Sequence, residues 1–278
     1  MGKRVNRFNT ENESPEKQRQ IATTGTKKKF SLQDLRRLMP LTLNQQRFKD
    51  AYNDKIDVIF QLGAAGCGKT SMALSEAFYE VLDPNTVYEK IVIIRSAVEA
   101  RKIGHLPGEL EEKQAPFEDP YRELVKDIFK YADPYDNLKA CGLLEFRLTS
   151  HLRGLNLDNA IVILDEAQNL DYEELDTVYT RITATSKIII CGDGKQTDLH
   201  RYREQSGLSK FASIFDNMHK YKDDFADMSN MLFPQYDDAE INNYRNVPDY
   251  AVINYQPQDC LRNPKVRKYL ITKHKMGL

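Results

Sequence analysis

Short apolar runs alternate along the chain with segments whose apolar residues recur at helical spacing. The segments with helical spacing predict helices over residues 31–40, 44–54, 69–82, 120–132 and 172–182. The apolar runs predict buried strands over residues 57–62, 90–95, 143–148, 160–165 and 187–193. Strands that alternate with helices predict an α/β fold, in which a parallel sheet is flanked by helices and carries its active groups at the carboxyl ends of the strands.

This alternation is confined to residues 31–211, which we expect to form the core of the protein. Residues 1–30 are polar and basic with little to bury, which predicts a disordered tail. Its Lys27–Lys29 cluster is either a phosphate contact or an ordinary solvated charge run. Residues 212–256 are acidic and aromatic with weak periodicity and predict an insertion, whereas residues 257–278 predict a basic helix that packs on the core.

Composition narrows the class of protein. The 278 residues carry a net charge of −1, so no overall basic excess indicates a nucleic-acid partner. The cysteines stand far apart, which argues against a zinc site or a disulfide framework and favours a reducing cytoplasm; they are Cys67, Cys141, Cys191 and Cys260. No apolar run approaches the ~18 residues that span a bilayer, and the N-terminus lacks the apolar stretch of a secretory signal. We therefore expect a soluble cytoplasmic protein without a membrane partner.

The segment GAAGCGKT, residues 63–70, fits the Walker A template for phosphate binding. Its glycines let backbone N–H groups surround phosphates at the start of the following helix. Lys69 is expected to contact the β- and γ-phosphates of ATP, and Thr70 to ligate Mg²⁺. The predicted nucleotide-binding residues are Gly63, Ala64, Ala65, Gly66, Cys67, Gly68, Lys69, Thr70 and Ser71.

The ends of two further predicted strands contain residues that are candidates for ATP hydrolysis and γ-phosphate detection. The run AIVILDEAQNL resembles a Walker B segment, in which Asp165 enters the Mg²⁺ shell and Glu166 polarises the attacking water. The run KIIICGDGKQTDL places Gln196 where it can detect the γ-phosphate if its strand lies beside the Walker B strand. The alternatives are an exposed acidic strand end and a polar turn, respectively.

Gln45 lies about two dozen residues before Lys69 and is a candidate for reading the adenine edge through its amide. A solvent-facing position on the predicted helix over residues 44–54 is the alternative.

Taken together, several segments resemble the PhoH-like ATPases: residues 63–70, 95–113, 152–169, 180–199 and 206–208. The resemblance covers roughly residues 40–211, with a weaker similarity over residues 259–270. Cys67 stands where the family commonly has Thr, and Ser96 where Pro is usual, but neither change removes a phosphate ligand. Residues 212–256 depart from the compact family domain.

The resemblance implies a single RecA-like domain related to superfamily 1 helicases. It implies ATP hydrolysis coupled to RNA or other single-stranded nucleic acid, with Arg95 and Glu99 lining the nucleic-acid side of the sheet. It also implies a homo-oligomeric, hexameric ring. The fused ribonuclease of some relatives has no counterpart in the basic N-terminal residues.

Superfamily 1 helicases complete their site with arginines from a second domain. One domain must take this arginine from its own C-terminal residues or from a neighbouring copy. The candidates are Arg153, Arg181, Arg201 and Arg262, each of which has a surface ion pair as its alternative role.

The leading hypothesis is a Mg²⁺-dependent ATPase that moves along or remodels single-stranded nucleic acid, RNA before DNA. A nucleotide-dependent switch or scaffold for a protein partner is the alternative, which the near-neutral charge favours. A small-molecule kinase is disfavoured by Glu166 and Gln196.

Overall fold

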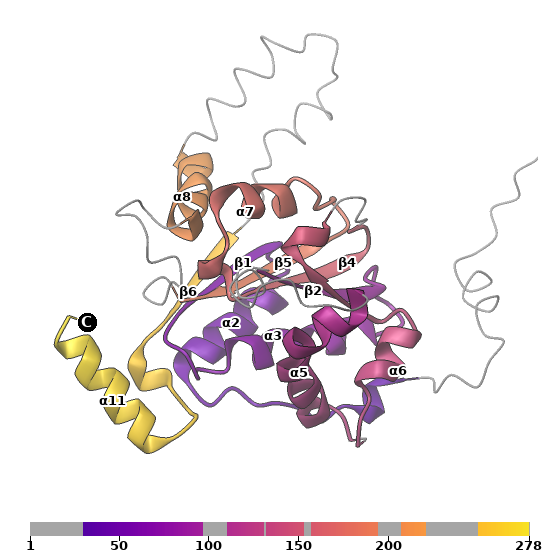
Figure 1. Cartoon of the computed structure of the whole chain (residues 1–278), viewed down its shortest axis with the longest axis horizontal. Coiled ribbons are helices and arrows are strands. Elements are labelled where there is room, and N and C mark those ends of the chain that lie inside the picture. Colours follow the sequence, from indigo (N-terminus) through magenta and orange to yellow (C-terminus); the bar gives the residue numbers. More distant parts are fainter. Residues whose placement is uncertain are drawn as a thin grey trace, which may run out of the picture.

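The computed structural model describes residues 30–96, 110–130, 132–152, 157–193, 207–220 and 250–277. Its centre is a six-stranded parallel sheet with strand order β3-β2-β4-β5-β1-β6 (Figure 1). The parallel sheet confirms the α/β class predicted from the alternating pattern. The strands are β1 (Val58–Gly63), β2 (Lys90–Arg95), β3 (Leu144–Leu148), β4 (Ala160–Asp165), β5 (Lys187–Gly192) and β6 (Tyr250–Tyr255).

Helices cover both faces of the sheet. Figure 1 shows α2, α3 and α5 on one side and α7 and α8 on the other, with α11 beyond the β6 edge. Among the described residues, no helix combines the length and apolarity needed to cross a membrane. The α-helices are α2 (Leu43–Asn53), α3 (Lys69–Val81), α5 (Leu110–Ile128), α6 (Tyr135–Ala140), α7 (Tyr172–Tyr179), α8 (Gly207–Lys220) and α11 (Pro264–Lys275). Short 3₁₀ turns are η1 (Leu32–Asp34), η2 (Thr149–His151), η3 (Ala167–Asn169) and η4 (Pro257–Asp259).

Two hydrophobic cores result, because successive strand residues point to opposite faces of the sheet. Ile161 and Ile163 of β4 join Phe78 of α3 in one core, whereas Val162 of the same strand joins Phe215 of α8 in the other. All of these side chains are fully or almost fully buried. Since both faces are covered, β2, β4 and β5 are largely apolar runs that were visible in the sequence, whereas β3 alternates apolar and charged residues.

The N-terminal described segment differs from its prediction. A helix was expected over residues 31–40, but only the 3₁₀ turn Leu32–Asp34 forms. Leu35 instead makes an antiparallel bridge with Phe129. The Arg36 N–H donates to the Ile128 carbonyl at 2.7 Å, which ties the segment to the end of α5. Tertiary hydrogen bonds thus override a helical pattern that is too short to persist alone.

The predicted end of the core at residue 211 is wrong. Residues 212–220 continue helix α8, whose Phe215 is buried in a core. Strand β6, within the predicted insertion, pairs with β1 along its whole length. Burial alternates over its last four residues, and the polar Asn254 interrupts its apolar residues. Residues 1–29 and 221–249 lie outside the described residues.

Candidate nucleotide site

The glycine loop joins β1 to α3 at the carboxyl edge of the sheet. Gly63 has φ +125°, and a Cβ there would lie 2.0 Å from the Tyr255 carbonyl oxygen of β6. Gly68 has φ +75° and precedes the first residue of α3. Both positions therefore require glycine, and the backbone they produce directs N–H groups at the helix start outward.

Lys69 folds back onto this loop. Its Nζ donates to the carbonyl oxygens of Gly63 at 2.7 Å and Ala64 at 2.9 Å. A phosphate at the start of α3 would offer the ammonium a charged acceptor, which makes a stronger hydrogen bond than a neutral carbonyl. The loop and Lys69 thus form an anion site of the kind predicted from the Walker A pattern.

Asp165 is held between two hydroxyl groups. The Thr70 Oγ1 donates to Asp165 Oδ1, and the Tyr121 hydroxyl donates to Asp165 Oδ2, each at 2.8 Å. Tyr121 comes from α5 and is 1% exposed. Because both carboxylate oxygens have a fixed partner, the side chain cannot rotate freely, and Oδ1 is directed to the start of α3.

Burial raises the pKa of Asp165, and the neighbouring Glu166 charge raises it further. The hydrogen bonds from Thr70 and Tyr121, followed by the charge of Arg95, act in the opposite direction. Arg95 ends β2 and stands opposite Asp165 in the sheet register. Its predicted nucleic-acid contact stays a prediction.

The chemistry of Thr70 and Asp165 fits Mg²⁺, which prefers oxygen ligands and is commonly held by one or two carboxylates together with substrate phosphates. Within the described ranges, no group of three His, Cys, Asp or Glu side chains could hold a metal ion. Thr70 and Asp165 are the residues that would hold the metal.

Glu166 begins a sharp turn after β4. Its φ of 52° places it in the left-handed region, which is uncommon for a residue with a side chain and costs on the order of 1 kcal/mol or more. Gln168 Nε2 donates to Glu166 Oε2 at 2.5 Å. Gln168 Oε1 accepts from the Asp193 N–H at 2.8 Å, so one buried amide connects the Glu166 carboxylate to the end of β5.

Strand β5 does lie beside β4, as the proposed γ-phosphate detector requires. Gln196 itself lies outside the described residues, as do Glu99, Arg153 and Arg201.

Gln45 lies against the loop and not in solvent. Its side chain is 3% exposed, its Oε1 accepts from the Leu41 N–H at 2.7 Å, and its Nε2 donates to the Cys67 carbonyl at 3.0 Å. The alternative of a solvent-facing residue is therefore wrong. A primary amide has two donors and two acceptor lone pairs, so a contact with adenine stays a prediction beside this role in holding the loop.

The two described candidate arginines lie at opposite ends of the sheet. Arg262 lies on the glycine loop, where a Cβ on Gly66 would be 3.3 Å from the Arg262 Cβ. The next N–H upstream, that of Leu261, donates to the Gly66 carbonyl at 3.0 Å. Arg181 lies in the connection from α7 to β5, which places it at the amino edge. Of the two, Arg262 is the arginine close to the loop of its own chain.

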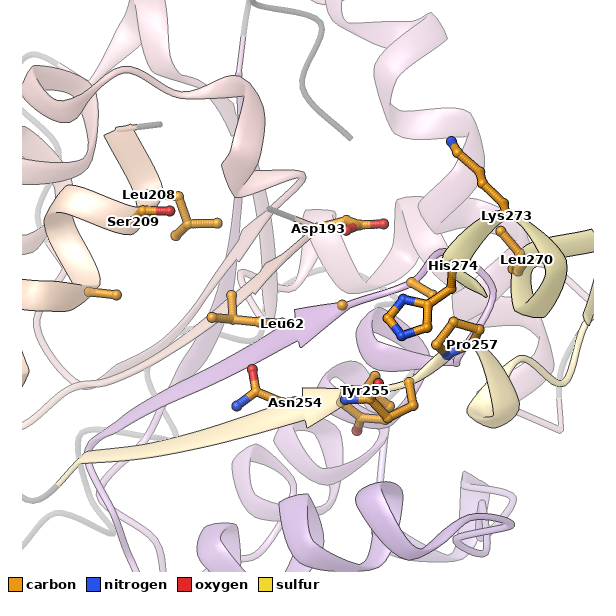
Figure 2. A pocket seen from close by; sticks show the side chains of 14 residues that line it. Leu62, Asp193, Leu208, Ser209, Asn254, Tyr255, Pro257, Leu270, Lys273 and His274 are labelled. Atoms are coloured by element: carbon orange, nitrogen blue, oxygen red, sulfur yellow. The ribbon is translucent and has the colours of Figure 1, made fainter. Parts of the chain in front are cut away.

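A cavity of about 380 Å³ borders the loop at Gly63 and Ala64, within the range of small-molecule sites. Figure 2 shows Asp193 at the end of β5 and His274 on α11 on facing sides of it. Groups that extend from a phosphate at the loop can enter this space.

Tyr121 and Gln168 were missing from the predicted site. Gln168 lies inside the Walker B segment, so its position was a usable signal. Tyr121 is 44 residues from Asp165 in the sequence, and no local pattern relates the two.

The phosphate loop is followed by a helix, and strand β4, one strand removed from β1, ends at Asp165 with Glu166 directly after it. This arrangement defines a P-loop NTPase fold and site. The family description "PhoH-like protein" matches residues 37–230. The chain therefore belongs to the PhoH-like family.

Relatives in several bacteria support this assignment. A PhoH-like protein of Mycobacterium tuberculosis is 34% identical over 184 residues, covering 65% of this chain and 50% of the relative. One from Bacillus subtilis is 38% identical over 169 residues, with 60% and 51% covered. The chain thus spans about half the length of the relatives it matches.

Solved structures are more distant. The large terminase of a thermophilic bacteriophage, in complex with ADP, has a TM-score of 0.40 at 12% identity, covering 84% of this chain and 50% of the terminase. Pif1 from Bacteroides has a TM-score of 0.29 at 17% identity, with 63% and 36% covered. At these TM-scores, neither likeness bears on the chemistry of this chain.

Proposed function

We propose that this chain is a Mg²⁺-dependent ATPase that uses hydrolysis to bind, move along or remodel single-stranded nucleic acid, with RNA as the main substrate. The observation that carries the ATPase part is the group formed by Lys69, Thr70, Asp165 and Glu166 at one edge of the sheet. It supplies an anion site, a metal-binding oxygen pair and a carboxylate beside them.

Each residue has a distinct task in this proposal. Lys69 exchanges its loop carbonyls for phosphate oxygens and neutralises charge that grows there during transfer. Thr70 and Asp165 hold Mg²⁺, which when bound lowers the charge on the phosphates. Glu166 accepts a hydrogen bond from the attacking water and orients it. Gln168 links this carboxylate to the end of β5, so the state of one strand end affects the other.

The nucleic-acid part rests on membership of the PhoH-like family, since resemblance to that family implies action on RNA or other single-stranded nucleic acid. We also propose assembly into a homo-oligomeric, hexameric ring. A ring allows a neighbouring copy to supply an arginine, although the position of Arg262 favours a contribution from the same chain. The near-neutral net charge of −1 favours the alternative, a nucleotide-dependent switch for a protein partner.

Glu166→Gln tests the catalytic assignment. The substitution keeps the shape of the side chain and removes its charge, so we expect kcat to fall by about 100-fold or more while ATP affinity is retained. Lys69→Ala is the matched control and should lose both ATP binding and hydrolysis. Rates of phosphate release and binding of a fluorescent ATP analogue measure the two properties. Wild-type turnover by Glu166→Gln would refute this role.

Single-stranded RNA, single-stranded DNA or no nucleic acid in the same assay tests the substrate. Stimulation of ATPase activity that weakens with salt supports the proposal. Nucleotide-dependent capture of a protein without any stimulation by nucleic acid would favour the switch instead. A native mass measurement on the same sample tests the hexamer.

A further inference from the structure

Helix α11 concentrates positive charge in a chain whose net charge is only −1. Its sequence, PKVRKYLITKHK, contains six basic or titratable cationic side chains and no acidic one. None of its residues is buried. The charges of such a helix are usually only solvated. Whether α11 binds a partner therefore depends on how its charges are arranged and on how the helix is attached to the rest of the protein.

Three of these positive charges follow one face of the helix. Lys265, Lys268 and Lys275 are exposed and recur at i, i+3 and i+10, with Thr272 between the last two. Tyr269, on the same face, is 65% exposed. We call these five residues the α11 stripe; it runs about 15 Å along the helix at 1.5 Å per residue.

The opposite face of α11 is attached to the protein. Leu270 packs against the core on the α2–α3 side and lines the cavity beside the loop. Arg267 Nε donates to the Cys260 carbonyl at 2.6 Å. The α11 stripe therefore has a fixed outward orientation at the β6 edge, where Figure 1 shows the helix beside the end of the sheet.

The same attachment leads to the nucleotide site. Only three residues separate Cys260 from the first residue of α11, and the first two of them contact the phosphate loop. Leu261 donates to the Gly66 carbonyl, and Arg262 lies against Gly66. Helix α11 is therefore joined to the phosphate loop by a short, hydrogen-bonded connection.

We propose that the α11 stripe binds the phosphate backbone of single-stranded RNA and couples that binding to the phosphate loop. The proposal rests on the nucleic-acid part of the proposed function. Three lysines on a helix whose sequence contains no carboxylate complement a chain of phosphates, and an exposed tyrosine among them offers a stacking surface to an unpaired base. A membrane is less suited, because Leu270 of the helix turns inward and leaves no broad apolar face on this described helix.

The experiment compares two charge-matched variants of the whole chain. Lys265→Glu, Lys268→Glu and Lys275→Glu combined reverse the α11 stripe. Lys55→Glu, Lys126→Glu and Lys220→Glu combined are the control; these exposed lysines precede β1, lie near the end of α5 and end α8. Fluorescence anisotropy of labelled oligo-U and oligo-dT gives Kd over a range of salt concentrations.

We expect the stripe variant to bind oligo-U at least tenfold more weakly and the control within twofold of wild type. The slope of log K against log salt should become shallower by about 2, from roughly 0.7 for each of three lost phosphate contacts. Stimulation of the ATPase should be lost while the basal rate is unchanged. The corresponding Lys→Gln triple variant repeats the test if the charge-reversed chain folds poorly.

The outcomes separate the inference from the proposed function. If wild type binds oligo-U and the stripe variant binds equally well, the α11 assignment is wrong and the function stands. If wild type binds neither oligonucleotide, both are wrong. Stronger stripe-dependent binding of oligo-dT, or stripe-dependent binding of phosphatidylserine vesicles without RNA binding, would overturn the choice of RNA.

Discussion

The amino ends and the carboxyl ends of the strands form two edges of the sheet. Each of these edges holds a lysine away from bulk water, but the two lysines have different partners. At the amino edge, Lys187 is 1% exposed, with its Nζ 4.0 Å from the Tyr52 ring centre and 3.6 Å from Glu80 Oε2. At the carboxyl edge, Lys69 donates to two backbone carbonyls of its own loop. Lys187 is surrounded by packed side chains, whereas the partners of Lys69 are neutral groups that a phosphate can replace.

The pKa values of the groups at the amino edge reflect their burial. Burial lowers the pKa of Lys187, and the nearby Glu80 charge partly restores it. Burial also raises the pKa of the adjacent Tyr52, with Glu80 adding to the effect. The charge of Lys187 is thus partly compensated by Glu80 within a packed group of side chains. At the carboxyl edge, Glu166 instead has a strained backbone conformation, and Lys69 has neutral partners that a phosphate can replace. Both features suit a site whose partners change during a reaction.

The largest difference in kcat is expected between substitutions of the two arginines, Arg262 at the carboxyl edge and Arg181 at the amino edge. Arg262→Ala removes a cation beside the phosphate loop, and we expect kcat to fall by about 100-fold, as for other transition-state donors. Arg181→Ala, at the amino edge, should stay within twofold. Steady-state ATPase rates measure both. The reverse ranking would mean that a neighbouring copy supplies Arg181 to the site.

A smaller effect is expected from Tyr121→Phe. The change removes one hydrogen bond to the Asp165 carboxylate, worth about 1.5–3 kcal/mol for a charged acceptor. The Mg²⁺ concentration for half-maximal ATPase should therefore rise by roughly 10- to 100-fold. Tyr135→Phe on α6 alters another buried tyrosine and serves as the control. An unchanged Mg²⁺ requirement in Tyr121→Phe would show that Tyr121 only fills space.

Lys187→Met should have the smallest effect on turnover, less than twofold per folded molecule. It leaves Glu80 without its cation and removes the interaction with the Tyr52 ring, so the free energy of unfolding should fall by about 2–3 kcal/mol. Lys90→Met is the control: its ion pair with Glu145 is partly exposed, and we expect a loss below about 1 kcal/mol. Denaturant titration measures both. Equal losses would remove the contrast between the two edges.

Local patterns predicted the strands well because both faces of the sheet are covered. Strands β2 and β4 have the predicted bounds, and the other three predicted strands differ by one residue at one or both ends. The phosphate loop was equally visible, since Gly63 and Gly68 require backbone conformations that other residues avoid.

The features that the sequence did not predict depend on contacts between distant parts of the chain. Among the described residues, strand β6 pairs with β1 alone, and it lies at the end of an acidic, aromatic stretch of weak periodicity in which its short apolar run was not recognised. Helix formation over residues 31–40 was prevented by pairing with Phe129, far along the chain. Tyr121 joined the site through the packing of α5 on the sheet. No short window of sequence contains such contacts.

The sequence by itself determined the phosphate loop, the paired carboxylates and the parallel α/β class, because each depends on residues adjacent in the chain. Only the tertiary structure decided that β6 closes one side of the sheet and that Tyr121 holds Asp165. It also decided that Arg262, which precedes α11, lies on the loop. These last features depend on contacts between residues from 44 to more than 190 positions apart, and chain topology alone brings such residues together.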